Sequence, residues 1–273
     1  MPSTYAHYRF GQDIRTRLSG APRAAIEAWP ELYLIGIHGP DILFYYRALF
    51  NDPVNSTGYR LHAEPGRSFF ATAKHAIEAA PSRDAALAYA YGVLDHFALD
   101  MSCHGYVDEK IATSGVTHTE IEVEFDRSLM LSDGLDPVRH SLTGHIRPTA
   151  ENAAVIAPFY PGVTPAQVQK ALKSMISQNC FLLARTGLKR HAIYAVLRLT
   201  GNYKEMHGLI VNPKGKPACA DSNARLGELY QLAITRALAF IPEFDAYLQG
   251  KAELDPLFDY TFGGKLTKGG KEA

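Results

Sequence analysis

The sequence has no long apolar run, few cysteines and no excess of either charge, and each absence excludes a class of protein. No stretch approaches the ~18 consecutive apolar residues that a membrane-spanning helix needs, so no transmembrane segment is expected. The N-terminus, MPSTYAHYRFGQDIRTRL, lacks the apolar core and the small-residue cleavage site of a secretory signal. The three cysteines are an odd number at no framework spacing, which indicates reduced thiols and predicts a cytoplasmic protein.

The charges balance. Lys and Arg total 28, and Asp and Glu also total 28. Long polyanions such as duplex DNA usually bind a basic face, so the balance gives no strong nucleic-acid signal, although it does not exclude a local basic patch. Several catalytic signatures are also missing from the sequence: the Gly-x-Ser-x-Gly elbow, the P-loop, Gly-x-Gly-x-x-Gly and His-Glu-x-x-His.

The hydrophobic pattern is helical almost throughout, and 47% of the 273 residues are hydrophobic. Alternating strand patterns with hairpin turns are nearly absent. We therefore predict an all-α fold with many helices in a single domain over residues 1–263, followed by a disordered tail over residues 264–273. Helices are expected over residues 5–18, 22–37, 65–80, 83–104, 118–130, 168–183 and 221–247. Loops are expected at 51–67, whose Pro65-Gly66 opens the next helix, and at 201–220.

Eight side chains that bind zinc well form one ordered series in the first half of the chain. They are His7, Asp41, His62, His96, Asp100, His104, His118 and Glu122. Imidazole nitrogen and carboxylate oxygen are the ligands of hydrolytic zinc sites. The sequence therefore predicts a metal centre built from several elements.

The densest part of this series is His96, Asp100 and His104. Spacings of four place these side chains along one stripe of a helix, with the ends roughly 12 Å apart along the axis, so one ion cannot take all three. His118 and Glu122 form a second pair one helical turn apart. The spacing favours more than one metal ion.

Other candidate residues receive weaker roles. His38 could hold a ligand by a hydrogen bond from outside the coordination sphere. Glu120 and Glu124 point to other helix faces than Glu122, so we expect them to be solvated. No ligand role is expected for His75, His140, His145, His191 and His207.

The series resembles the zinc-dependent phospholipase C family, which shares its fold and three-zinc site with the single-strand nucleases of fungi and plants. Secreted bacterial members carry His-x3-Asp, then a His, then His-x3-Glu some fourteen residues further, and the residues from His96 to Glu122 repeat that order. The phrases TYAHYRFG, GIHGPDILF and TEIEVEFDR are similar to shorter bacterial members without a signal. The resemblance covers residues 1–130, and the remainder matches only as further helix.

The resemblance implies two to three zinc ions. The first would be held by Asp41, His62, His96 and Asp100, and the second by His104, His118 and Glu122. The third would be shared by Asp100, His7 and the terminal amine of Pro2 or Met1. Asp41 would be a ligand, the catalytic base, or both.

The implied activity is hydrolysis of a phosphate ester by zinc-activated water, whose pKa the metals lower to roughly 7. A small phosphodiester or a phospholipid is the expected substrate. The alternatives are a single-strand nuclease-like phosphodiesterase and a non-catalytic metal-binding protein on the same scaffold. The apolar run ILFYYRALF after Asp41 is expected to be core, with a lipid-facing rim in transient contact with a membrane surface as the alternative.

Overall fold

Side-chain caps and prolines set the starts of the longest helices. The Ser82 hydroxyl accepts from the Ala85 amide and begins α6 (Arg83–Ser114), as the sequence predicts. Thr117 forms a capping box at the start of α7 (His118–Ser132), and Thr164 forms another before Pro165 at the start of α9 (Pro165–Leu182). The α6 helix therefore persists through the whole predicted ligand stripe.

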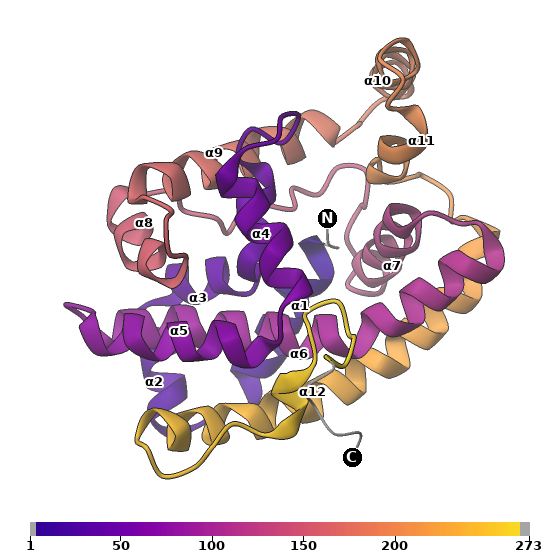
Figure 1. Cartoon of the computed structure of the whole chain (residues 1–273). Helices are drawn as coiled ribbons and strands as arrows, with labels where there is room; N and C mark the ends of the chain where they lie inside the picture. The colour runs from indigo at the N-terminus through magenta and orange to yellow at the C-terminus, as the bar shows by residue number, and fades with distance from the viewer. Residues whose placement is uncertain (1–3, 268–273) are drawn as a thin grey trace.

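The computed structural model describes residues 4–267, and over that range the predicted all-α fold is confirmed (Figure 1). No β-strand occurs in this range, only two isolated bridges. The remaining helices are α1 (Thr4–Arg17), α2 (Gly20–Ala28), α3 (Pro30–Gly36), α4 (Pro53–Ala63), α5 (Gly66–Ala79), α8 (Ala150–Ile156), α10 (Gly187–Leu199), α11 (Tyr203–Met206) and α12 (Ala220–Leu248). Short 3-10 helices are η1 (Gly39–Tyr45), η2 (Ala157–Phe159), η3 (His207–Leu209), η4 (Pro217–Cys219) and η5 (Pro256–Asp259).

Three sequence predictions about elements are wrong. The helix expected over residues 22–37 is two helices, because Pro30 cannot donate to the preceding turn and starts α3 instead. The loop expected over residues 51–67 contains α4, which begins with Pro53 after a capping box between Asp52 and Asn55. The loop expected over 201–220 contains α11 and two 3-10 turns.

The central element is α6, whose residues from Ala85 to Cys103 are almost all buried. Helices α1, α2, α3, α5 and α12 pack around it, and Figure 1 shows α6 and α12 as two long neighbouring helices. The crossing with α3 is close because glycines meet there. A Cβ on Gly92 would lie 2.4 Å from the Tyr33 carbonyl oxygen, and one on Gly36 would lie 2.3 Å from the Tyr89 carbonyl oxygen.

The C-terminal segment returns to the centre of the molecule. Gly66 donates to the Tyr260 carbonyl, and bridges join Pro65 to Thr261 and Tyr260 to Leu266. Residues 264–267 of the predicted tail are therefore held in place by backbone hydrogen bonds, while residues 268–273 lie outside the described range. None of the described helices has the length and apolar character to cross a membrane.

Candidate metal centre

Five elements bring the eight predicted ligands together. Helix α6 supplies His96, Asp100 and His104, while α1, η1 and α4 supply one each and α7 supplies two. The structure forms three groups in which all ligand atoms lie within 4.8 Å of one another. The groups are His7 with His96 and Asp100, Asp41 with His62 and His96, and His104 with His118 and Glu122.

Asp100 lies between the groups. Its Oδ1 is 3.1 Å from His7 Nε2 and 3.8 Å from His104 Nε2. Its Oδ2 is 3.3 Å from His96 Nε2 and 3.9 Å from His62 Nε2. Each oxygen of this carboxylate therefore faces two imidazoles, which suits a residue shared between metal ions.

The other two carboxylates each face a histidine. Asp41 Oδ1 is 2.7 Å from His62 Nε2. Glu122 Oε1 is 2.8 Å from His118 Nε2 and 3.3 Å from His104 Nε2. Each pair offers nitrogen and oxygen at a separation that one ion can bridge.

Backbone carbonyls orient two of the imidazoles, and sequence reasoning could not find them. The Gly58 carbonyl lies 2.8 Å from His62 Nδ1, and the Phe262 carbonyl lies 3.1 Å from His104 Nδ1. A hydrogen bond to Nδ1 leaves Nε2 free for a metal. The Gly58 contact is local to α4, but the Phe262 contact spans 158 residues and has no sequence signal.

Gly39 closes the site from the η1 side. Its φ is +49°, a region that favours glycine, and a Cβ there would lie 2.4 Å from His96 Cδ2. The His38 carbonyl then accepts from the Asp41 amide at 3.1 Å. The tight turn at Gly39 therefore packs closely against His96 and places Asp41 in the site.

The donor set fits a bound metal. Several buried polar atoms have no hydrogen-bond partner among the described residues, namely His7 Nδ1, both ring nitrogens of His96, Asp41 Oδ2, Asp100 Oδ2 and Glu122 Oε2. Unpaired buried polar atoms are costly, and most such atoms in proteins are hydrogen-bonded or coordinate a metal. The mixed imidazole and carboxylate set is one that zinc accepts.

Burial and charge act on these groups in opposite directions. Burial lowers the pKa of His96 to about 4. Burial also opposes protonation of His104, but the carboxylates of Asp100 and Glu122 outweigh it and raise the pKa of His104 to about 10. Burial disfavours the ionised form of Asp100, yet His104, His96 and His7 hold its pKa well below the usual range. The centre is therefore a strongly coupled ionic cluster before any metal binds.

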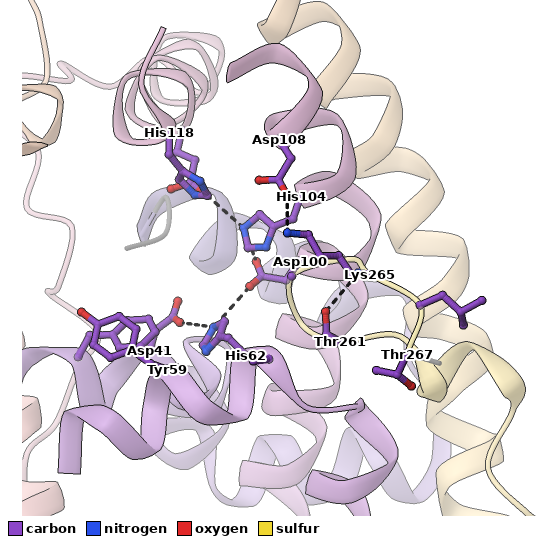
Figure 2. A pocket seen from close by; sticks show the side chains of 15 residues that line it. Asp41, Tyr59, His62, Asp100, His104, Asp108, His118, Thr261, Lys265 and Thr267 are labelled. Carbon is purple, nitrogen blue, oxygen red and sulfur yellow. Dashed lines mark hydrogen bonds and ion pairs between the residues drawn. The ribbon is translucent and has the colours of Figure 1, made fainter. Parts of the chain in front are cut away.

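The centre opens to solvent through a cavity of about 610 Å³ (Figure 2). Its wall on the α4 side includes a stacked pair, Phe44 and Tyr59, with ring centroids 4.4 Å apart. At the mouth, Lys265 Nζ lies 3.0 Å from Asp108 Oδ2. The cavity also exposes Asp41, His62, Asp100, His104, His118 and Glu122, and the C-terminal segment adds Thr261, Gly263, Leu266 and Thr267.

Helix α1 is anchored so that His7 reaches the centre. The buried carboxylate of Asp126 accepts from the backbone amides of Tyr5 and Ala6 at 2.9 and 2.7 Å. This carboxylate satisfies two of the free amides in the first turn of α1. The expected role of the terminal amine of Met1 or Pro2 lies outside the described residues.

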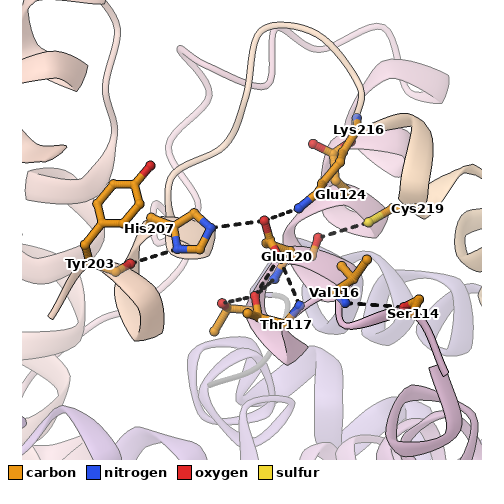
Figure 3. A network of polar contacts seen from close by, with 10 residues as sticks. Ser114, Val116, Thr117, Glu120, Glu124, Tyr203, His207, Lys216 and Cys219 are labelled. Atoms are coloured by element: carbon orange, nitrogen blue, oxygen red, sulfur yellow. Dashed lines mark hydrogen bonds and ion pairs between the residues drawn. The ribbon is translucent and has the colours of Figure 1, made fainter. Parts of the chain in front are cut away.

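The expectation that Glu120 and Glu124 are solvated is wrong (Figure 3). Glu120 pairs with Lys216 and with His207, whose Nε2 lies 3.1 Å from Glu120 Oε1. Glu124 is buried and accepts from Arg127 and from the Lys216 backbone amide. The segment 203–219 packs over this face of α7, and that packing buries Glu124 and partly buries Glu120.

His38 does not hydrogen-bond a proposed ligand through its imidazole. Its Nε2 lies 2.7 Å from His145 Nε2, and the two rings stack. Burial is the main cause that lowers the pKa of both residues. No ligand group of the described residues includes any of the five histidines for which we expected no ligand role, His75, His140, His145, His191 and His207.

Comparison with known protein families identifies a relationship. A family model described as zinc dependent phospholipase C matches residues 6–160, which include all eight proposed ligands. Searches of curated proteins and of solved structures gave no match.

Proposed function

Because this chain belongs to the zinc-dependent phospholipase C family, we propose that it hydrolyses a phosphodiester, with a phospholipid as the natural substrate. The observation that carries the proposal is the convergence of the three ligand groups around Asp100 at the floor of an open cavity. A centre that served only to hold the fold together would have no need of a cavity large enough for a phosphorylated head group.

The residues would hold zinc in three places. His104, His118 and Glu122 form one site, and Asp41 and His62 form another with His96. His7 and Asp100 form the third, in which Asp100 is shared. Zinc bound there supplies Lewis-acid stabilisation of the phosphoryl oxygens and a water of lowered pKa.

Asp41 is our candidate for the residue that handles the proton of the attacking water. Its Oδ1 faces His62, while its Oδ2 is buried without a hydrogen-bond partner, and the residue lines the cavity. A cavity water beside this carboxylate can transfer its proton to it as the water oxygen attacks phosphorus in line. The phosphorus–oxygen bond to the glycerol breaks, the phosphorylated head group keeps the oxygen of the attacking water, and the glycerol oxygen leaves as diacylglycerol after taking up a proton from the protonated Asp41 or from cavity water.

A single-strand nuclease is supported less well. The stacked Phe44 and Tyr59 could receive a base, but binding a nucleic-acid strand also needs a basic groove. Within the described residues, the cavity is lined by one Lys and no Arg, and that Lys265 already pairs with Asp108. The lining therefore favours a short phosphodiester over a long polyanion.

The experiment is elemental analysis combined with a substrate panel. Protein purified without chelator should hold at least two zinc ions and release diacylglycerol from phosphatidylcholine, with little cleavage of single-stranded DNA. Salt-sensitive DNA cleavage without lipid turnover would favour the nuclease instead. Bound zinc with no turnover of any phosphodiester would favour the non-catalytic alternative.

A further inference from the structure

One segment outside the metal centre has an unusual charge. Residues 152–204 contain no Asp and no Glu but seven basic residues, Lys170, Lys173, Arg185, Lys189, Arg190, Arg198 and Lys204. The chain as a whole has a formal net charge of zero, so the rest of it is net acidic. The segment includes α9 and α10, which lie next to each other in the chain.

Helix α10 has an apolar face that the protein does not cover. Leu188, Ala192, Ala195, Val196 and Leu199 follow the i, i+4, i+7, i+8, i+11 spacing of one helix face, and all are exposed. Leu188 is 84% exposed and Leu199 is 87% exposed. The opposite face already packs its own apolar residues, because Ile193 and Leu197 are buried in a small cluster with Ala184 and Ile210. An apolar face of this kind usually marks an interaction surface.

More exposed apolar side chains lie along the same edge of the molecule. Leu49 is 74% exposed and Phe50 is 71% exposed, in the turn before α4, and Phe181 is exposed at the end of α9. Figure 1 places this turn, the C-terminal end of α9 and α10 along the upper edge of the ribbon. We call these three residues and the exposed face of α10 the apolar edge.

Contacts tie the parts of this edge together. Gln178 in α9 donates to the Tyr45 carbonyl at 3.2 Å, close to the turn that carries Leu49 and Phe50. Lys189 in α10 lies over the Phe181 ring at 5.9 Å. The turn, the end of α9 and the start of α10 are therefore neighbours through contacts as well as in the view.

Five of the seven basic residues of the segment are exposed to an external anion. Among the described residues, none of the seven forms an ion pair with a carboxylate. Lys189 and Arg190 donate to neutral oxygens, while Lys170, Lys173, Arg185, Arg198 and Lys204 are exposed. Lys170 lies 5.1 Å from the centre of the Tyr46 ring, which places it beside the turn.

We propose that the apolar edge docks onto the surface of an anionic phospholipid bilayer. Leu49, Phe50, Leu188 and Leu199 would enter the boundary between head groups and acyl chains, while the exposed cations face lipid phosphates. Apolar side chains flanked by Lys and Arg are the combination that binds such surfaces. A second copy of this chain fits less well, because two copies meeting at this edge would bring the same positive charge together. The docking does not depend on the proposed hydrolysis.

The test is co-sedimentation of the full chain with vesicles of phosphatidylcholine alone or mixed equally with phosphatidylglycerol. Wild type should bind the mixed vesicles more tightly, and added salt should weaken the binding. Replacing both Leu188 and Leu199 by Ser should weaken binding to mixed vesicles about tenfold or more. The double change Lys173→Gln with Arg185→Gln should weaken the preference for anionic vesicles about tenfold, since each cation near the surface contributes about 1 kcal/mol. The matched control is Leu232→Ser on α12, where an exposed leucine lies outside the edge and binding should be unchanged.

Circular dichroism and turnover of a water-soluble phosphodiester should be unchanged in all variants, which separates this proposal from the proposed function. Equal binding of wild type to both kinds of vesicle, or unchanged binding by the leucine variant, would overturn it. A dimer seen by light scattering that the leucine variant abolishes, with no vesicle binding, would assign the edge to a second copy instead.

Discussion

Of the eight proposed ligands, Asp100 is the one that lies between the others and is proposed to be shared between metal ions. Its neighbours one turn away in each direction on α6 are His96 and His104, so a single helix places a carboxylate between two imidazoles. Helices α1 and α4 bring His7 and His62 to the same carboxylate. A carboxylate with two free oxygens can serve two ions at once, which an amide of the same shape cannot do.

Asp100→Asn should therefore lose at least one zinc per chain and lower turnover about a hundredfold or more. The reason is that, in the proposed catalysis, bound zinc stabilises the charge on the phosphoryl oxygens and lowers the pKa of the attacking water. The matched control is Glu109→Gln, the same change from carboxylate to amide at an exposed position of α6. Zinc content and turnover are measured for both. Equal and mild effects would show that Asp100 is not a shared ligand.

The raised pKa of His104 leads us to expect that zinc binding releases protons. Its pKa is raised to about 10, so its protonated form persists at neutral pH in the metal-free chain and is lost only as the pH rises through that value. Zinc binds the neutral imidazole, so binding must expel this proton, and the apparent affinity should rise about tenfold per pH unit between roughly pH 7 and 10.

The measurement is calorimetric zinc titration in two buffers of different ionisation enthalpy. His75→Ala, a change at an exposed histidine of α5, should release as many protons as wild type. Zinc uptake without proton release would mean that His104 is already neutral or is not a ligand.

At the scale of elements, the α3–α6 crossing determines where the ligand stripe lies. Gly36 and Gly92 let the two helices approach until a Cβ would touch backbone on the other side. This contact lies one turn before His96, and η1 with Asp41 follows α3 directly. Any separation of the two helices would therefore move Asp41, which follows α3, away from the proposed ligands on α6.

Gly92→Ala should lower the free energy of unfolding by about 3 kcal/mol, because overpacking against backbone cannot be relieved by a rotamer change. Gly227→Ala on α12 is the matched control, since no atom lies within 4 Å of its Cβ position. That change should raise stability by about 0.5–1 kcal/mol through helix propensity. Urea denaturation measures both, and a Gly92 variant as stable as wild type would show that the helices can separate at little cost.

Helix α7 shows how elements remote in sequence stabilise the site. Its first turn carries His118 and its second carries Glu122. On another face of the helix, Glu120 pairs with Lys216 and His207. The segment that supplies these partners lies about 90 residues further along the chain, as the contact between His207 and Glu120 shows with its separation of 87. The second half of the chain thus contributes to the site by positioning α7.

At the scale of the whole molecule, metal binding and folding should be coupled. The ligand cluster places several polar atoms in the interior without hydrogen-bond partners. Dialysis against a chelator should lower the melting temperature, and added zinc should restore it, with a gain of about 3 kcal/mol at a free zinc concentration a hundredfold above Kd.

Differential scanning calorimetry before and after chelation measures this effect. Asp100→Asn should respond less to the chelator than wild type does, because its metal content is already reduced. An unchanged melting temperature, in protein shown by elemental analysis to be free of zinc, would mean that the cluster is stable without metal.

The sequence by itself determined the helical class, most helix positions and the set of candidate ligands. These follow from local rules: Ser82, Thr117 and Thr164 cap the helices that follow them, and the spacing of His96, Asp100 and His104 makes one stripe on any α-helix. The helix at Pro53–Ala63 had an equally local signal in its Asp52 capping box, and we misread it as a loop.

Only the tertiary structure decided how His7, Asp41 and His62 meet that stripe, because their positions depend on the packing of α1, η1 and α4 against α6. The same holds for the Phe262 carbonyl at His104, for the cavity wall at residues 261–267, and for the burial of Glu124. The contact of Phe262 with His104 joins residues 158 positions apart, and that of Lys216 with Glu124 joins residues 92 positions apart. No local propensity specifies which distant surfaces will pack together. The apolar edge has the same origin, since a periodic helix such as α10 shows its uncovered face only when its neighbours are in place.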